Sequence, residues 1–247
     1  MDSLDAPGNM GLLDQTMAMQ WVYNNIEFFG GDKTKITLFG QSAGAKSVGL
    51  HLVSKLTANY FYNAILDSGS PVAIPVITKS QDSIAKNRAF LNFIGCQDVA
   101  CALKLDANLL LTQVSKFNHN ISSFIFDPNP PFSPVVDGYY LLDQPEVLLI
   151  KGLFKKCSII TGTNLNEGNM FLKSAFPGIY NSTTPPDLDF ITFLRLLADY
   201  FYNYPKYPYI ASNTIQSSIL YRYTNWTNPY NYNSILTNLD HAVGNVI

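Results

Sequence analysis

Apolar residues near the start of the chain recur at a helical spacing. The positions are Leu12, Leu13, Met17, Trp21 and Val22, and Leu13, Met17 and Trp21 follow one another at intervals of four residues. This spacing is typical of a helix that buries one face. We therefore expect a helix that runs to about residue 25, with these side chains on its buried side.

Two short β-rich runs follow, with a helical stretch between them. Residues 36–39 (Ile-Thr-Leu-Phe) and 63–66 (Asn-Ala-Ile-Leu) are apolar and bounded by turn residues, which predicts two strands. The spacing of Val48 and Leu52 predicts a helix over residues 43–52. An order of helix, strand, helix and strand favours an α/β fold, with a mostly parallel sheet flanked by helices.

The remainder of the chain is irregular before it becomes helical. Residues 158–162 predict a third strand, and residues 163–168 predict a polar loop after it. The proline-dense run 127–134 excludes a helix or an interior strand there, because proline lacks the backbone N–H that both need. Further helices are expected over residues 83–94, 188–201, 210–221 and 234–243.

Composition narrows the class of protein. The chain has 247 residues, of which 47% are hydrophobic and 14% charged, enough apolar surface to bury a core and too much for a disordered chain. No apolar run approaches the ~18 residues of a transmembrane helix.

The net charge is −2 and the basic residues are scattered, so nucleic acid is not an expected partner. No residue spacing predicts a metal or nucleotide site, so we expect no cofactor.

One short motif suggests covalent chemistry. Gly40-x-Ser42-x-Gly44 lies between the first predicted strand and the helix after it, which is the setting in which a serine becomes an exposed nucleophile. Glycines on both sides are expected to let the chain turn sharply without Cβ clashes. The N–H of Ala43, at the helix start, is then available to stabilise an oxyanion. Five-residue patterns also arise by chance, and a plain glycine-rich turn is the alternative.

A series of longer motifs resembles the type-B carboxylesterase/cholinesterase family. The matches include the segments 6–15 (Ala-Pro-Gly-Asn-Met-Gly-Leu-Leu-Asp-Gln), 28–32, 39–45 (Phe-Gly-Gln-Ser-Ala-Gly-Ala), 65–71, 134–138, 162–168 and 223–226. The resemblance covers essentially the whole chain. It implies an α/β-hydrolase fold and serine-dependent hydrolysis of small carboxylic esters. It also implies that residues 1–247 form a single partial domain that is incomplete at both ends, with the oligomeric state left open.

The resemblance assigns roles to individual residues. Ser42 corresponds to the nucleophile, Ala43 to one oxyanion-hole donor and Glu167 to the triad acid, which orients a histidine. A solvated loop carboxylate is the alternative for Glu167. Ser68 corresponds to a serine that supports the acid, although a simple turn residue explains it equally well. Gly40 and Gly44 support the nucleophile.

The third member of the triad has no clear counterpart. His51 follows Ser42 by nine residues on the same predicted helix, about 13 Å along its axis, and cannot reach it. His119 lies in a polar, Asn-rich stretch and is expected at the surface. His241 follows Glu167 in the right order, but its surroundings resemble a helix that precedes the family's catalytic loop. We expect the catalytic histidine beyond Ile247, and the glycine-rich oxyanion loop before Met1.

The resemblance also bears on the pocket and the cysteines. Phe132 is the one aromatic residue retained near the acyl pocket, so the substrate need not be restricted to acetyl esters. Gln41 stands where many relatives carry an acid, with an effect on rate left open. Cys96 and Cys101 bracket a short loop where the family often forms a disulfide. Cys157 is expected to be a buried free thiol.

Localisation and activity are open at this stage. Three N-glycosylation sequons, at Asn120, Asn181 and Asn225, mildly favour a secretory origin, as does the family resemblance, which suggests a secreted or extracellular glycoprotein. Residues 1–7 are no signal peptide, so the chain is expected in the cytoplasm if Met1 is its true start. A non-catalytic cholinesterase-like adhesion or structural protein, and an inactive truncated product, are the alternatives to an esterase.

Overall fold

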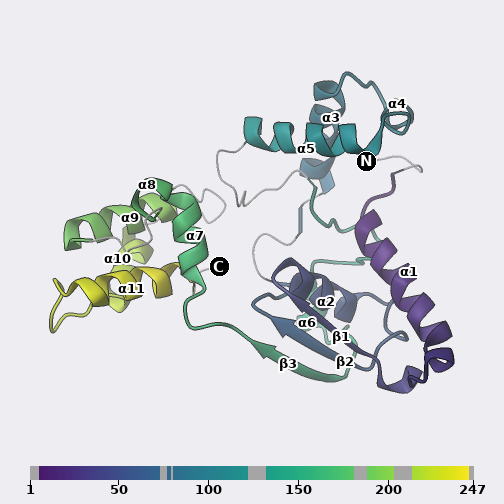
Figure 1. Ribbon diagram of the computed structural model, residues 1–247, viewed down its shortest axis with the longest axis horizontal. Coiled ribbons are helices and arrows are strands. Elements are labelled where there is room, and N and C mark those ends of the chain that lie inside the picture. The colour runs from purple at the N-terminus through teal and green to yellow at the C-terminus, as the bar shows by residue number, and fades with distance from the viewer. Residues whose placement is uncertain are drawn as a thin grey trace. The chain divides into compact units, whose positions relative to one another are not determined.

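The computed structural model describes residues 6–72, 77–78, 80–121, 132–180, 188–202 and 213–244. The chain forms two compact units, whose elements are labelled in Figure 1. The first unit comprises Met1–Ser123 and Asn129–Thr163, and the second comprises Phe124–Pro128 and Asn164–Ile247.

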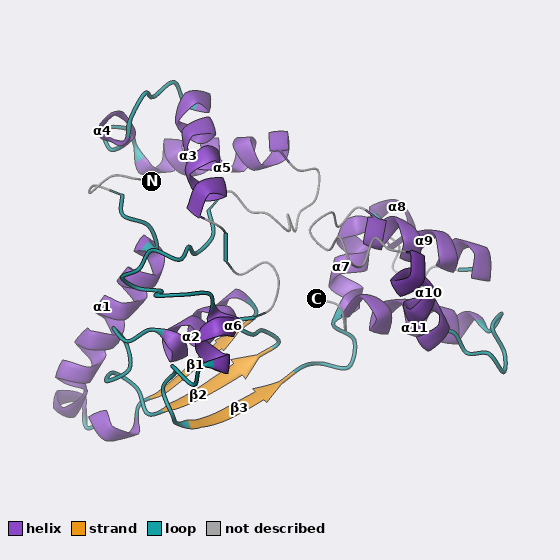
Figure 2. Cartoon of the chain, turned by 180° about the vertical axis from the view of Figure 1, so that it is seen from behind, coloured by secondary structure: helices purple, strands orange, loops and turns teal. Residues whose placement is uncertain are grey.

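The first unit contains a parallel three-stranded sheet (Figure 2). Its strands are β1 (Thr37–Gln41), β2 (Asn63–Asp67) and β3 (Ser158–Gly162), in the order β1-β2-β3. At their carboxyl ends, Gln41 lies opposite Asp67, and Asp67 lies opposite Gly162. The predicted strands are confirmed, and with them the α/β class. Parallel strands end at one edge of a sheet, so the residues that follow them are neighbours.

Helix α2 (Ala43–Val53) packs against β1 and β2. Ala45, Val48 and Leu52 on this helix form one apolar cluster with Ala64 and Leu66 of β2. The helix buries most of its residues after Ala45, so it anchors the turn at its own start. The expected helix over 43–52 is therefore confirmed.

The first helix of the unit, α1 (Met10–Asn25), ends where its spacing predicts, but it buries a different set of side chains. Leu12 and Met19 are buried, whereas Met17 is 69% exposed and Trp21 is 58% exposed. The expectation that Met17 and Trp21 belong to the buried side is wrong. Met19 and Leu12 join separate apolar clusters with residues of α2, so the contact with α2 decides which side of α1 is buried.

Asn9, just before α1, ties this helix to a distant loop. Its Nδ2 donates to the Val135 carbonyl at 2.8 Å and to Asp137 Oδ2 at 2.8 Å, while its Oδ1 accepts from the Val135 N–H at 2.9 Å. Asp137 Oδ1 in turn accepts from the Leu141 N–H. Asn9 adopts φ 54°, a left-handed conformation that asparagine tolerates better than most residues. Two segments carrying family motifs are thus joined by one side chain.

The other elements of the first unit are short or peripheral. The expected helix over 83–94 is confirmed as α3 (Ser80–Phe93), and α5 (Ala107–Ile121) contacts it. Of the proline-dense run, residues 132–134 are described, and they form neither helix nor strand. The elements are the 3₁₀ turns η1 (Ile26–Phe29) and η2 (Lys33–Lys35) and the helices α3 (Ser80–Phe93), α4 (Val99–Ala102), α5 (Ala107–Ile121) and α6 (Pro145–Ile150).

The regular elements of the second unit are all helices among its described residues. Helix α11 (Tyr232–Gly244) packs against α7 (Gly168–Ala175) and α9 (Phe190–Tyr202), and α10 (Asn213–Arg222) packs against α9. A buried cluster that includes Leu172, Phe193, Leu196 and Leu239 forms the core of the unit. The three helices expected in this region are confirmed. The elements are α7 (Gly168–Ala175), α8 (Pro177–Tyr180), α9 (Phe190–Tyr202), α10 (Asn213–Arg222) and α11 (Tyr232–Gly244).

Candidate active site

Ser42 occupies the turn between β1 and α2 in a strained backbone conformation. Its φ of 53° and ψ of −117° are rarely adopted by residues with a side chain, at a cost of about 1–3 kcal/mol. Two hydrogen bonds hold the turn: the Ser42 N–H donates to the Asp67 carbonyl at 2.9 Å, and the Ser42 carbonyl accepts from the Lys46 N–H at 2.9 Å. The strain is therefore stabilised by β2 on one side and by α2 on the other.

The turn is sterically tight on one side. A Cβ on Gly40 would lie 2.4 Å from the carbonyl carbon and oxygen of Gly44, whereas a Cβ on Gly44 would meet nothing within 4 Å. The expectation that both glycines relieve a clash is correct for Gly40 and wrong for Gly44. It is the backbone carbonyl of Gly44 that lies close to Gly40, whereas a Cβ on Gly44 would point into open space. Sequence reasoning missed Gly69, where a Cβ would lie 2.5 Å from the Ser42 carbonyl oxygen.

Positive potential is available beside Ser42. Ala43 is the first residue of α2, so its N–H belongs to the first turn, where backbone donors have no partner within the helix. The helix dipole adds a partial positive charge at the same end. Lys46 is half-buried, and burial lowers the pKa of its ammonium group. These groups favour an anion that forms at the start of α2.

Ser68 follows β2 as Ser42 follows β1. Its N–H donates to the Gly162 carbonyl of β3 at 2.8 Å, and its φ is 51°. Ser68 therefore repeats the left-handed backbone of the nucleophile position. Its role toward Glu167 stays a prediction, because Glu167 belongs to the second unit.

Glu167 lies at the end of a tight loop before α7. Its Oε1 accepts from the Asn164 backbone N–H at 2.7 Å and from Asn164 Nδ2 at 3.2 Å. Glu167 is half-buried and is the N-cap residue of α7. These two donors from Asn164 hold the Glu167 side chain in one direction, and its assignment as the triad acid stays a prediction.

Asp240 of α11 accepts a hydrogen bond from the loop that carries Glu167. Asp240 is 7% exposed, and the Asn166 side-chain amide, with its nitrogen toward the carboxylate, donates to Asp240 Oδ2 at 3.1 Å. Burial raises the pKa of Asp240, although the backbone N–H groups of Gly168 and Asn169 oppose that rise. A Cβ on Gly168 would lie 2.0 Å from the Asp240 carbonyl oxygen. The signal for this contact in the sequence is an acid among the apolar positions of α11.

His51 is committed to a buried hydrogen-bond network. The residue is 2% exposed, its Nε2 lies 2.9 Å from Gln15 Oε1, and its Nδ1 lies 2.7 Å from the Tyr140 hydroxyl. Since the Gln15 oxygen can only accept, Nε2 carries the proton and Tyr140 donates to Nδ1. Burial lowers the pKa of His51 to about 4. This agrees with the expectation that His51 is not the catalytic base.

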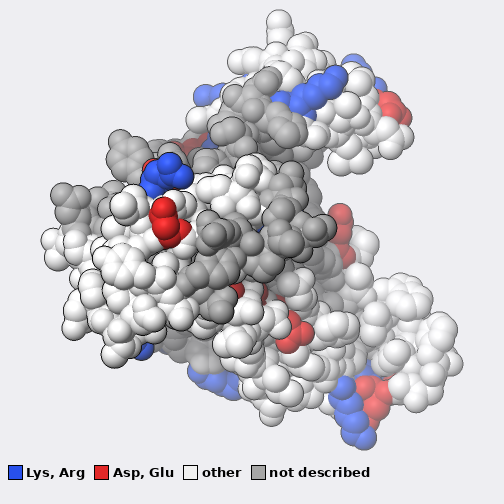
Figure 3. Space-filling view, turned by 60° about the vertical axis from the view of Figure 1, so that its left-hand side comes forward, with Lys and Arg blue, Asp and Glu red and all other residues white. Residues whose placement is uncertain are grey.

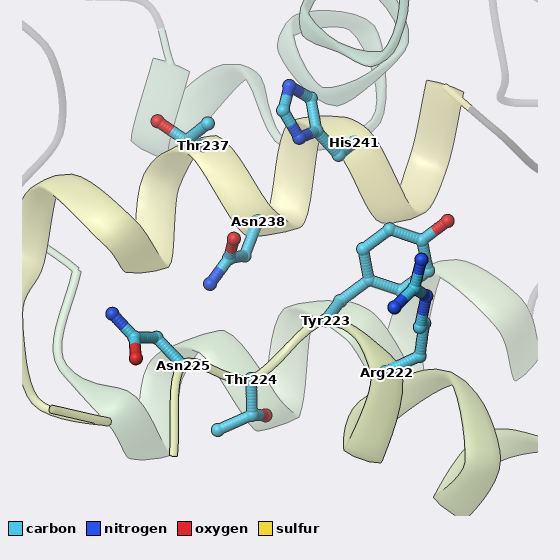
Figure 4. Close-up of a pocket in the computed structure, with 7 residues that line it drawn as sticks. All are labelled: Arg222, Tyr223, Thr224, Asn225, Thr237, Asn238 and His241. Carbon is cyan, nitrogen blue, oxygen red and sulfur yellow. The ribbon is translucent and has the colours of Figure 1, made fainter. Parts of the chain in front are cut away.

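The other two histidines lie elsewhere. The side chain of His119, near the end of α5, is outside the described residues. His241 is on α11, and among the described residues its buried Nε2 has no hydrogen-bond partner. It lines a pocket of about 610 Å³, shown in Figure 4, whose other lining residues come from α11 and from the end of α10 and the segment after it. They are Arg222, Tyr223, Thr224, Asn225, Thr237 and Asn238.

The cysteines and Phe132 are placed as follows. Cys96 and Cys101 form the expected disulfide, with Cα atoms 5.5 Å apart. Cys157 is a free thiol that is half-buried rather than fully buried, and burial raises its pKa. The Phe132 ring meets the Phe90 ring of α3 edge to face, at 5.2 Å between centroids. Its assignment to an acyl pocket stays a prediction.

Three further observations on the described residues concern charge, metal binding and membranes. Lys and Arg side chains are scattered among uncharged ones on the face shown in Figure 3. Within the described ranges, no three His, Cys, Asp or Glu side chains gather as a metal site would require. Among the described helices, none is both long and apolar enough to span a membrane.

Comparison with known proteins agrees with this geometry. A parallel sheet that delivers a strained serine to the start of a helix is the arrangement of the α/β hydrolases. A model of the carboxylesterase family matches residues 1–247. The chain belongs to the carboxylesterase family and has the α/β-hydrolase fold of that family.

The chain is similar to several cholinesterases. It is 34% identical to acetylcholinesterase of Bungarus fasciatus, over 98% of this chain and 39% of that protein. It is 35% identical to acetylcholinesterase 1 of Caenorhabditis elegans, over 81% of this chain and 32% of that protein. It is 34% identical to cholinesterase 1 of Branchiostoma lanceolatum, over 90% of this chain and 62% of that protein. The chain thus spans about two fifths or less of the first two relatives.

Proposed function

We propose that this chain carries the nucleophile and the acid of a serine-dependent carboxylic ester hydrolase. The observation that carries the proposal is Ser42 itself, a non-glycine residue at φ 53° between a parallel strand and a helix N-terminus. Strain of this kind persists only where surrounding structure enforces it. Here Gly40, Gly69 and the Asp67 carbonyl enforce it.

The proposed reaction begins at the Ser42 hydroxyl. Its Oγ attacks the ester carbonyl carbon while its proton passes to an imidazole base. The carbonyl oxygen becomes an oxyanion, which the Ala43 N–H stabilises. The bond to the alcohol then breaks, and the alcohol leaves with the proton from the imidazole. Water attacks the acyl-serine in the same way, which releases the carboxylic acid and restores Ser42.

Glu167 is the proposed partner of that base. A carboxylate beside an imidazole selects its tautomer and stabilises the imidazolium that forms. The two Asn164 donors on Oε1 hold the Glu167 side chain in one direction, and Asp240 fixes the loop behind it. Neither His51 nor the other two histidines of the chain is assigned as the base.

The proposed substrate class is a general small carboxylic ester. Gln41 places a neutral amide at the end of β1, next to Ser42, where many relatives carry an acid. A neutral neighbour gives no electrostatic preference for a cationic alcohol such as choline.

We place the protein in the secretory pathway or outside the cell. The Cys96–Cys101 disulfide supports this proposal, since disulfides persist in oxidising compartments and are rare in the cytosol.

Covalent labelling tests the proposed function. The 247-residue chain is treated with a fluorescent fluorophosphonate, beside Ser42→Ala and the control Ser47→Ala, which removes a hydroxyl from the next turn of α2. Labelling that persists in the control and disappears in Ser42→Ala supports an activated Ser42. In a chain that labels, Glu167→Gln is expected to slow the reaction, on the order of 10⁴-fold for loss of a triad acid. A folded chain that does not label shows that these residues alone do not activate Ser42, which contradicts an active site complete within the chain.

A further inference from the structure

The segment between α10 and α11 carries an exposed glycosylation motif. Asn225-Trp226-Thr227 satisfies the sequon Asn-x-Ser/Thr, in which x is not proline. All three residues are exposed, and Trp226 is 55% exposed. The motif therefore lies where a bulky hydrophilic group fits without entering the core.

The motif forms a compact turn that brings its two essential side chains together. Asn225 Oδ1 accepts from the Thr227 backbone N–H at 3.2 Å and from Thr227 Oγ1 at 2.5 Å. The Asn228 N–H donates to the Asn225 carbonyl at 3.1 Å, which closes the turn. The Trp226 indole N–H donates back to the Tyr221 carbonyl at 2.9 Å. The native fold thus presents the asparagine and the threonine hydroxyl in contact, on the surface.

The setting of Asn225 differs from that of Asn120, another of the three sequons. Asn120 lies within the last turn of α5, and Asn181 lies outside the described residues. Asn225 also lines the polar pocket of Figure 4, across from Asn238 of α11. A sugar attached there would meet amide and hydroxyl groups instead of apolar surface.

We propose that Asn225 is an N-glycosylation site of this protein. The donor is an oligosaccharide joined through a diphosphate to a lipid carrier. Asn225 Nδ2 loses a proton and bonds to the anomeric carbon of the first sugar, while the bond from that carbon to the diphosphate oxygen breaks and the lipid diphosphate leaves. The proposal rests on the secretory location proposed above and is independent of the esterase reaction.

The test uses the full chain behind a cleavable secretion signal in eukaryotic cells. Translocated protein is treated with peptide-N-glycosidase in heavy-oxygen water, and the peptide containing Asn225 is analysed by mass spectrometry. Conversion of Asn225 to a heavy-oxygen aspartate is expected. Thr227→Ser retains the sequon and should keep the modification, whereas Thr227→Val, of the same shape without the hydroxyl, should lose it, as should Asn225→Gln.

Two results would overturn the proposal. One is translocated chain, protected from added protease inside microsomes, in which Asn225 is unmodified. The other is a glycosidase-sensitive mobility shift of equal size in the parent chain and in Asn225→Gln, which assigns the glycan to another sequon. Fluorophosphonate labelling of the same preparation reports separately on Ser42, so failure of the glycan and failure of the esterase are distinguishable.

Discussion

Ser42 and Ser68 occupy equivalent positions, each one residue beyond the end of adjacent parallel strands. Their φ values are 53° and 51°, and each N–H donates to the last carbonyl of the next strand, at 2.9 Å for Asp67 and 2.8 Å for Gly162. The nucleophile turn is thus one step of a repeated backbone pattern at the carboxyl edge of the sheet. Its strain depends on strand register as well as on the local motif.

Gly40→Ala is expected to disrupt the nucleophile turn, whereas Gly44→Ala is not. The added methyl group at Gly40 would lie 2.4 Å from the Gly44 backbone, but at Gly44 it enters open space. We expect Gly40→Ala to lose at least about 1–3 kcal/mol of unfolding free energy and any labelling of Ser42. Gly44→Ala should be neutral or gain up to about 1 kcal/mol, because alanine favours helix. Urea denaturation of both variants measures this, and equal losses would contradict the one-sided clash.

Stability is expected to depend on pH through His51. Its folded-state pKa of about 4 is below the ordinary 6.5, so the unfolded chain binds the extra proton between these values. The unfolding free energy should therefore rise from pH 4 to pH 6.5, by up to about 3 kcal/mol from this group. Urea denaturation across that range measures the rise. His51→Gln should reduce it, and an unchanged slope in the variant would show that other groups are responsible.

Tyr140→Phe is expected to destabilise the first unit. The change removes the hydroxyl that donates to His51 Nδ1 at 2.7 Å and leaves a buried acceptor unsatisfied, at a cost of about 1–3 kcal/mol. Tyr139→Phe is the matched control, since Tyr139 is 65% exposed and should change little. Thermal and urea unfolding compare the two. Equal effects at both positions would argue against the buried network.

Asp240→Ala is expected to loosen the loop that carries Glu167. The variant removes the acceptor for the Asn166 amide and for the N–H groups of Gly168 and Asn169, at about 1–3 kcal/mol. Hydrogen exchange of residues 164–169 should accelerate. Asp199→Ala, an exposed acid on α9, is the control and should leave exchange unchanged. Protection that survives in Asp240→Ala would show that Asn164 alone holds the loop.

Much of the fold could be predicted because its signals are local. The strand over 158–162 and the helix after Ser42 follow from apolar spacing and turn residues, and the structure reproduces both. The side chains that α1 buries were mispredicted at Met17 and Trp21, since helical spacing marks an apolar stripe without saying what covers it.

The nucleophile position could be predicted from the sequence, but the groups that support it could not. The glycines on either side of Ser42 indicate that it is the nucleophile position. Gly69 approaches Ser42 only after β2 pairs with β1, and Asp240 reaches Gly168 only after α11 packs on α7. Contacts between segments so far apart in sequence leave no periodic signature in either one.

The two serine turns differ in how much of the chain each one needs. β1, α2 and β2 are contiguous, so the carbonyl that accepts from Ser42 lies in the next strand along the chain, at Asp67. Ser68 must wait for Gly162, which follows α3, α4, α5 and α6. Long-range pairing of this kind slows folding, because a large loop must close first. The Ser42 turn therefore depends on pairing between strands that are close in sequence, whereas the Ser68 turn depends on closing the long segment between β2 and β3.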